Sequence, residues 1–178
     1  MSKELEKELW DKCVAFHGHE CGGLTIGFKA SLYAMKLLKI GYSKDEEIVC
    51  VTENDACGVD AIQVVLGCSV GKGNLLFKLR GKQAFSFYNR KTDESIRLVL
   101  MDRPQMTREE SFAYMQGKEP EELFEVKTTT MVLPTQARIF NSIKCEKCGE
   151  TVAENMIFIE NEQMVCKDCR SDYNRFCN

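Results

Sequence analysis

The sequence has no excess of basic residues and no long uncharged run, and each absence argues against a class of function. Its 178 residues contain 24 Lys and Arg against 27 Asp and Glu, so the net charge is −3. Proteins that bind nucleic acids or membrane surfaces usually carry a basic excess, so neither role is expected. The longest uncharged run is residues 61–71, whereas a membrane-spanning helix needs about 18 such residues. Residues 1–10 lack the apolar core of a signal peptide, which predicts a cytoplasmic protein.

Repeats and low-complexity segments are also absent, and a hydrophobic content of 44% is typical of a folded chain. The pattern predicts an α+β core domain over residues 1–141, with helices on a mixed or antiparallel sheet, followed by a small module over 142–178. Apolar residues at helical spacing predict helices over about 3–16 and 24–39, with Gly41 as the C-cap of the second.

The remaining elements follow from local composition. A short helix ends near Gly67, and a capping box of Thr107 and Glu110 begins another. Residues 119–126 are predicted to add one or two helical turns, and 128–140 a strand or an extended linker. Runs rich in β-branched and aromatic residues predict four strands, at 46–54, 74–80, 83–90 and 95–102.

Ten cysteines are unusual for a chain of this size without an export signal. In a reducing compartment they serve as metal ligands, redox thiols or small buried apolar residues. Cys13, Cys50 and Cys68 lie in apolar runs and are predicted to pack in the core. Cys177 lies near the end of the chain and is predicted to have no role.

The last 34 residues contain two CxxC pairs with the spacing of a zinc ribbon. Seventeen residues separate the pairs, which are formed by Cys145, Cys148, Cys166 and Cys169. Four thiolates close a tetrahedron around Zn²⁺, and the ion supplies the folding free energy that so small a module lacks. Between the pairs, a hairpin is predicted with Glu160 and Asn161 at its bend. Two redox CxxC pairs are the alternative.

The charge of this module favours protein docking over nucleic-acid binding. Residues 142–178 contain five basic and seven acidic residues, a net charge of −2, and four thiolates around Zn²⁺ add further negative charge. Phosphate binding depends on releasing counterions to a basic surface, so a zinc-finger regulator is the less favoured interpretation.

The only two histidines, His17 and His19, lie beside Cys21 in a glycine-rich segment. On a helix, His17 and Cys21 would share a face while His19 pointed away, but a loop could bring all three together. Imidazole and thiolate suit Zn²⁺ or a similar metal, and Cys57 is a further candidate ligand for this core site. The alternative is that one of the two histidines caps a helix or forms its hydrogen bonds within the core, without a metal.

Catalytic candidates in the core are Cys57, Cys21 and Asp60. Cys57 could be a nucleophile activated by a neighbouring histidine. Asp60 could orient a metal-bound histidine, or it could be an ordinary charge at a helix N-terminus. Residues 67–74 resemble a phosphate loop, but the spacing is wrong and no hydroxyl follows Lys72, so Lys72 is at most a weak candidate for holding an anion.

Four segments in this order resemble the FmdE family of formylmethanofuran dehydrogenase components: FHGHECGGLTIGFKA, DACGVDAIQVVLGCSVGKGN, GKQAFSFYNR and IFNSIKCEKCGE. The resemblance implies an α+β domain with a zinc finger, an intertwined homodimer, and a metal or active site at His17, His19, Cys21 and Cys57. It also implies that the molybdenum or tungsten pterin chemistry belongs to other subunits. Where the family often has Cys-Pro-Gly, this chain has Cys21-Gly22-Gly23.

Two functions from different classes fit these observations. The first is an accessory metal-binding protein, a dimeric scaffold whose ribbon holds a structural zinc and docks a partner, such as a molybdenum or tungsten enzyme complex. The second is a small metalloenzyme, with a metal of unspecified identity held by His17, His19 and Cys57 and an open position for substrate. The first is favoured because none of the core carboxylates has a spacing that marks it as a general base.

Overall fold

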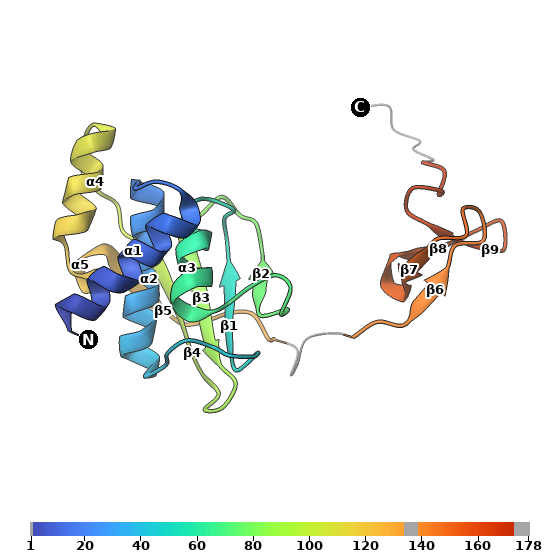
Figure 1. Cartoon of the computed structure of the whole chain (residues 1–178), viewed down its shortest axis with the longest axis horizontal. Helices are drawn as coiled ribbons and strands as arrows, with labels where there is room; N and C mark the ends of the chain where they lie inside the picture. The colour runs from blue at the N-terminus through green and yellow to red at the C-terminus, as the bar shows by residue number, and fades with distance from the viewer. Residues whose placement is uncertain (1, 134–138, 173–178) are drawn as a thin grey trace. The chain divides into compact units, whose positions relative to one another are not determined.

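The computed structural model describes residues 2–133 and 139–172, and the chain separates into two compact units, Met1–Ala137 and Arg138–Asn178 (Figure 1). The first unit contains helices and a mixed sheet, which confirms the predicted α+β class. The second contains two small hairpins and a cluster of four cysteines. No helix in the described ranges is both long and apolar enough to cross a membrane.

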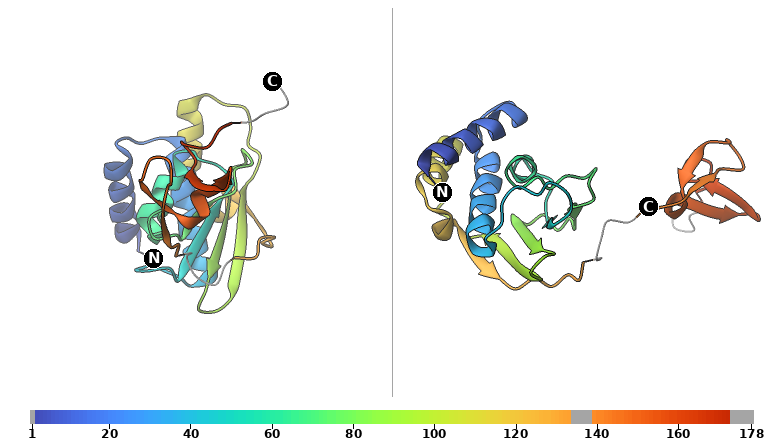
Figure 2. Two further views of the ribbon diagram at one scale, coloured as in Figure 1. Left: turned by 90° about the vertical axis from the view of Figure 1, so that its right-hand side faces the viewer. Right: turned by 60° about the horizontal axis from the view of Figure 1, so that its bottom comes forward.

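The central helix of the first unit is α2, which packs against the other helices and the sheet (Figures 1 and 2). The five helices are α1 (Lys3–His17), α2 (Gly22–Leu38), α3 (Gly58–Leu66), α4 (Arg108–Gly117) and α5 (Pro120–Leu123). The capping box that begins α4 is present, with Thr107 and Glu110 bonded reciprocally. Gly67 ends α3 in the left-handed conformation, with φ of 67°.

The sheet has the order β2-β1-β3-β4-β5, in which only β1 and β2 are parallel. Its strands are β1 (Ile48–Thr52), β2 (Leu75–Phe77), β3 (Ala84–Asn89), β4 (Glu94–Leu100) and β5 (Phe124–Lys127). The connection from β1 to β2 runs through α3, as a parallel pair requires. It places the start of α3 just beyond the C-terminal end of β1.

Two elements of the first unit differ in detail from the prediction. Residue Lys39, with φ of 50°, is the C-cap of α2 instead of Gly41, because the helix ends one residue earlier than the pattern indicated. The segment 119–126 begins with one helical turn, which agrees with the prediction, but its second half is the edge strand β5, which was not predicted. Pairing with β4 overrides the helical preference of the glutamates there.

The core lies between the helices and one face of the sheet. Its largest fully buried side chains include Phe85 and Phe87 from β3 and Leu24 from α2. Cys13, Cys50 and Cys68 are fully buried, as predicted. Burial raises the pKa of Cys13 and of Cys68 to about 12, so these thiols stay protonated and inert.

The segment after β5 is irregular, and hydrogen bonds hold it against strands β3 and β4 of the sheet. The Tyr88 hydroxyl donates to the Met131 carbonyl oxygen at 3.0 Å, and the Ser95 and Thr129 hydroxyls are 2.8 Å apart. Residues 128–133 are therefore extended linker without a strand, while 134–138 lie outside the described residues.

The second unit is built from two hairpins. The first pairs β6 (Ser142–Lys144) with β7 (Thr151–Ala153), and the second pairs β8 (Ile157–Glu160) with β9 (Gln163–Cys166), after the short helix η1 (Glu154–Met156). The bend of the second hairpin is Asn161–Glu162, one residue later than predicted. Both residues have positive φ, the geometry of a type I′ turn. Cys177 lies outside the described residues.

Candidate metal centres

The first centre begins with His17 at the end of α1. The apolar face of α1 packs on the core, and Gly18 ends the helix with φ of 92°. A side chain is strained at that φ, so glycine allows the chain to turn immediately after the histidine. The imidazole is left at the edge of the core, with 12% of the side chain exposed.

Cys21 and Cys57 each lie directly before the first residue of a helix. Cys21 is the N-cap of α2, and its sulfur accepts a hydrogen bond from the Leu24 N–H at 3.3 Å. Cys57 is the N-cap of α3. The positive end of a helix dipole favours an anionic sulfur at both positions.

Close packing of α2 against α3 brings these two helix N-termini together. A Cβ on Gly27 would lie 1.9 Å from the Gly58 carbonyl oxygen, so this crossing admits only glycine. A Cβ on Gly23 would lie 3.0 Å from the Cβ of Cys57. The glycines on α2 therefore set how near Cys57 approaches Cys21. The recurrence of glycine at positions 23 and 27, one helical turn apart, was the signal in the sequence for this contact.

The three side chains His17, Cys21 and Cys57 form one cluster. Their ligand atoms all lie within 4.8 Å of one another, and Nε2 of His17 is 3.7 Å from Sγ of Cys21. Nitrogen and sulfur ligands of a tetrahedral Zn²⁺ lie about 2.0–2.3 Å from the ion, which places them roughly 3.5–3.8 Å apart. The donor set and its geometry therefore fit a metal ion and leave one of four tetrahedral positions without a side chain from this group.

Asp60 fixes the orientation of His17. Its Oδ2 lies 2.7 Å from Nδ1 of His17, while its Oδ1 accepts a hydrogen bond from Nε2 of Gln63 at 3.2 Å. With Nδ1 protonated toward the carboxylate, Nε2 presents its lone pair to the cysteines. A carboxylate behind a ligating histidine is the common arrangement in protein metal sites. Gln63, which holds Asp60 from the next turn of α3, is a residue that the sequence did not suggest.

His19 is not part of this cluster. Its ring stacks against that of His17 at 4.6 Å between centroids, and the residue is exposed. The turn at Gly18 has thus brought Cys21 to His17 without bringing His19 into the group of three.

Two further carboxylates of the core and the anion candidate Lys72 have other partners. Glu20 accepts a hydrogen bond from the Trp10 indole at 3.0 Å, and Glu53 is paired with Arg97. The Lys72 ammonium donates to the Ser43 carbonyl oxygen at 2.8 Å, so an anion at residues 67–74 would compete with that bond.

Thiol ionisation at the cluster depends on what binds there. Burial raises the pKa of the Cys57 thiol, and the neighbouring Cys21 raises it further. A bound metal cation reverses this effect, because a coordinated thiol loses its proton. The Cys57 thiol is therefore suited to binding a cation and poorly suited to acting as a free thiolate at neutral pH.

The second centre is the four-cysteine cluster. Cys145 and Cys148 lie between β6 and β7, Cys166 ends β9, and Cys169 follows it. Their sulfur atoms all lie within 4.8 Å of one another, with 4.0 Å between Cys148 and Cys166. Backbone N–H groups point at the sulfurs, as the Cys166 N–H does toward Cys145 at 3.3 Å. Hydrogen bonds from the Cys148 and Cys166 backbones lower the pKa of Cys145 to about 6. Four such sulfurs can bind one metal ion and leave no open position.

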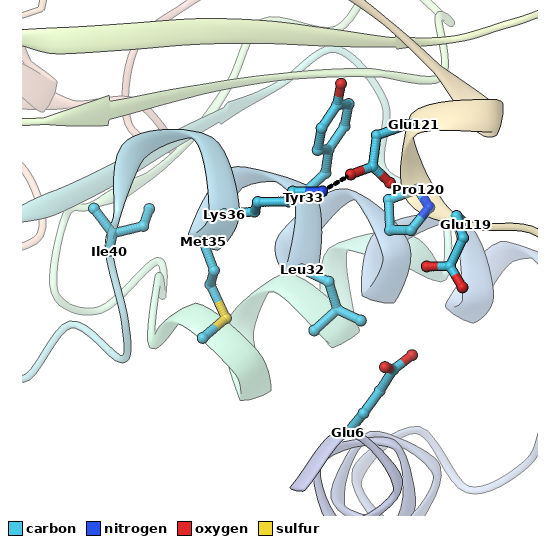
Figure 3. Close-up of a pocket in the computed structure, with 9 residues that line it drawn as sticks. All are labelled: Glu6, Leu32, Tyr33, Met35, Lys36, Ile40, Glu119, Pro120 and Glu121. Atoms are coloured by element: carbon cyan, nitrogen blue, oxygen red, sulfur yellow. Dashed lines mark hydrogen bonds and ion pairs between the residues drawn. The ribbon is translucent and has the colours of Figure 1, made fainter. Parts of the chain in front are cut away.

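The pocket drawn in Figure 3 is separate from both clusters. It has a volume of about 470 Å³ and lies between α2, α5 and the start of α1. Leu32 and Met35 supply an apolar wall, and Glu6 and Glu119 supply carboxylates. Lys36 and Glu121 form an ion pair at its rim. It has no cysteine or histidine in its lining, so it is no metal site of the predicted kind.

The fold and the two clusters define a metal-binding α+β domain joined to a four-cysteine module. The family model described as "FmdE, Molybdenum formylmethanofuran dehydrogenase operon" matches residues 16–146. The chain belongs to this FmdE family.

Two relatives share the architecture or the sequence. A crystal structure of a tungsten formylmethanofuran dehydrogenase FmdE-like protein from Syntrophus aciditrophicus superposes with a TM-score of 0.71 at 24% identity, covering 92% of this chain and 91% of that one. A probable S-adenosyl-L-methionine-binding protein of Archaeoglobus fulgidus is 26% identical over 89% of this chain. The match spans 51% of that protein, so this chain corresponds to about half of its curated relative.

Proposed function

We propose that this chain is an accessory metal-binding protein with two metal ions of different roles. The four-cysteine cluster holds a structural Zn²⁺, and the core cluster holds a second ion through His17, Cys21 and Cys57. The observation that carries the proposal is the convergence of these three ligand atoms within 4.8 Å of one another, from the end of α1 and the N-caps of α2 and α3. The carboxylate of Asp60 behind His17 supports it.

The two clusters differ in how readily they could exchange a metal. Four thiolates close a coordination sphere, whereas three side chains leave a position for water or an incoming ligand. His17 has 12% of its side chain exposed and Cys57 is partly exposed, whereas Cys21 is buried, so the core cluster is partly accessible from one side of its unit. An ion there can be delivered or removed. Such exchange suits a protein that handles metal for another enzyme.

The proposed assembly follows from family membership and charge. We propose that two copies of the chain associate, and that the acidic segment 142–178 docks a protein partner, a molybdenum or tungsten enzyme complex. The family description names molybdenum formylmethanofuran dehydrogenase, and the solved neighbour is named for the tungsten enzyme. A cytoplasmic location is consistent with the use of cysteines as metal ligands.

A small metalloenzyme is the second candidate, and the coordination position left by the three ligands favours it. A bound ion would polarise a substrate or a water molecule there. The chain's own contribution would be to hold His17 through Asp60 and to keep the thiolates of Cys21 and Cys57 at two helix N-termini. The relative named for S-adenosyl-L-methionine binding offers one substrate class for screening.

Metal counting on anaerobically purified full-length protein tests the proposal. We expect two ions per chain, falling to one in His17→Ala and in Cys57→Ser. The matched control is His19→Ala, which removes the other histidine and should leave two. One ion per chain in the wild type, unchanged in Cys57→Ser, would show that the core cluster binds no metal and would exclude both candidate functions as stated.

Cobalt substitution separates a closed core site from an open one. We expect the absorption bands of Co²⁺ in the core cluster to shift when azide is added, and those of the four-cysteine cluster to stay unchanged. Bands that do not respond at either cluster would mean that no position is available for exchange or for substrate.

A further inference from the structure

A second concavity of the first unit, of about 420 Å³, is lined mainly by cationic side chains. We call it the basic pocket, and it is defined by Lys78, Arg80, Lys82, Arg97 and Lys127 together with Glu53. Its lining has no cysteine or histidine, so it is separate from both metal clusters.

The basic pocket lies on the face of the sheet opposite the helices. Ile96 and Leu98 of β4 pack in the core under the helices, and strand geometry points the intervening Arg97 to the other face. Lys127 of β5 is the register partner of Arg97. The remaining cations follow β2, where the backbone N–H groups of Lys78 and Arg80 donate to the end of β1 at 2.9 and 2.8 Å. Ordered backbone therefore gathers these charges in one place.

The charge of the pocket contrasts with that of the chain. Five cations face a single carboxylate there, whereas the whole chain has a net charge of −3. Glu53 is already engaged, since both of its oxygens accept hydrogen bonds from Arg97, at 2.6 and 3.0 Å. Lys127 pairs with Glu125 at 2.9 Å. Among the described residues, Lys78, Arg80 and Lys82 form no ion pair. Like charges held together repel one another, and a bound anion removes that cost.

We propose that the basic pocket binds a small molecule that carries several adjacent anionic groups, such as a polyphosphate chain. Its volume lies in the range of small-molecule sites, about 300–1,000 Å³. Thr128 and Thr130 add hydroxyl groups to its wall, and the Arg80 guanidinium supplies N–H donors that suit phosphate oxygens. The cations surround one concavity and do not form a long track, which favours a compact ligand over a nucleic-acid strand. This binding site is additional to the metal-binding function and independent of it.

Calorimetric titration of full-length, zinc-loaded protein with inorganic triphosphate tests the proposal. We expect saturable binding of one triphosphate per chain, and about tenfold weaker binding in the double variant Arg80→Gln/Lys82→Gln, which removes two charge-assisted contacts. Both side chains are exposed, so the variant should fold as the wild type does. Metal analysis after each titration shows whether the zinc has been retained.

The matched control is the double variant Lys44→Gln/Lys91→Gln. It changes the net charge equally, but these residues flank the start of β1 and the end of β3, at the other end of the sheet from Glu53 and Ala84. Equal triphosphate affinity in the two double variants would overturn the proposal, as would heat that does not saturate. A single-stranded oligonucleotide that binds more tightly than triphosphate at the same salt concentration would also overturn it. Tighter binding of ATP than of triphosphate would support it and extend the ligand class to nucleotides.

Discussion

The Nδ1 atom of His17 lies 2.7 Å from Oδ2 of Asp60, and this contact joins the end of α1 to the first turn of α3 across 43 residues of sequence. Asp60 is thus a carboxylate in the first turn of α3 and also the hydrogen-bond partner of His17, the two roles that its position in the sequence allowed. Because Gln63 holds the other oxygen of the same carboxylate, the imidazole has one preferred orientation. Nε2 of His17 is therefore held facing Cys21, with 3.7 Å between Nε2 and Sγ.

Replacement of Asp60 by Asn should weaken metal binding at the core cluster without unfolding the protein. The amide cannot stabilise the charge that His17 shares with a bound ion, and loss of such a partner typically lowers metal affinity about 10–100-fold. Competition with a chromophoric chelator, on protein whose four-cysteine site stays loaded, measures the change. Asp55→Asn is the control, since Asp55 is exposed and two residues before Cys57. Equal affinities in the two variants would mean that Asp60 does not support the histidine.

Replacement of Gly27 by Ala should destabilise the first unit and disturb the core cluster together. The new Cβ would lie 1.9 Å from the Gly58 carbonyl oxygen, so α2 and α3 must move apart. Overpacking of this kind costs about 1–3 kcal/mol, and it also separates Cys21 from Cys57. Urea unfolding followed by fluorescence reports the stability, because Trp10, the only tryptophan, packs against Phe28 of α2.

Gly41→Ala is the matched control for that experiment. Nothing lies within 4 Å of a Cβ at Gly41, and the residue does not have positive φ. Its unfolding midpoint should equal or slightly exceed that of the wild type, since alanine restricts the unfolded chain. A Gly27→Ala protein with the stability of this control would show that the helix crossing tolerates a methyl group.

Local patterns in the sequence predicted most of the elements but could not place contacts between them. The spacing of the CxxC pairs was sufficient to predict a cluster of all four cysteines, because each pair is local and two short hairpins join them. The core cluster is different, since Cys57 reaches His17 and Cys21 only through the packing of α3 on α2. His19 was predicted to be a ligand because it lies close to His17 and Cys21 in the sequence. The turn at Gly18 leaves its side chain outside the cluster.

The basic pocket could not be predicted for a related reason. Its cations are spread over the β2–β3 connection, β4 and β5, and none of these segments is basic enough in the sequence to indicate an anion site. Only the register of the sheet brings Arg97 next to Lys127. The strand β5 was itself missed, because its glutamate-rich surroundings resemble the start of a helix and edge pairing is decided by tertiary structure.

Removal of metal by a strong chelator should unfold the second unit and leave the first folded. The apolar cluster around Val165 is too small to stabilise this unit alone, so we expect its folding to depend on an ion bound by the four cysteines. We expect the amide NMR signals of residues 139–172 to collapse to unfolded positions, while Trp10 fluorescence stays native. Cys166→Ser should reproduce this result in the presence of zinc, and the exposed Asp168→Ala should not. A second unit that stays folded after complete metal removal would contradict a structural metal.

The ion pair between Glu53 and Arg97 should make the first unit more stable at neutral pH than in acid. Its hydrogen bonds with Arg97 hold the pKa of Glu53 below the usual 4.5, so the pair stabilises the folded state above that pH and loses its effect as the pH falls. The side chains are only 12% and 16% exposed, and Glu53→Gln should cost about 2 kcal/mol at pH 7. The difference from the wild type should shrink at pH 3.5, measured by urea unfolding with Trp10 fluorescence.

The control is Glu8→Gln, which breaks an exposed ion pair with Lys12 and should change the stability at pH 7 by less than about 0.5 kcal/mol. A Glu53→Gln deficit that is equal at both pH values would show that the carboxylate charge is not what stabilises this end of the sheet.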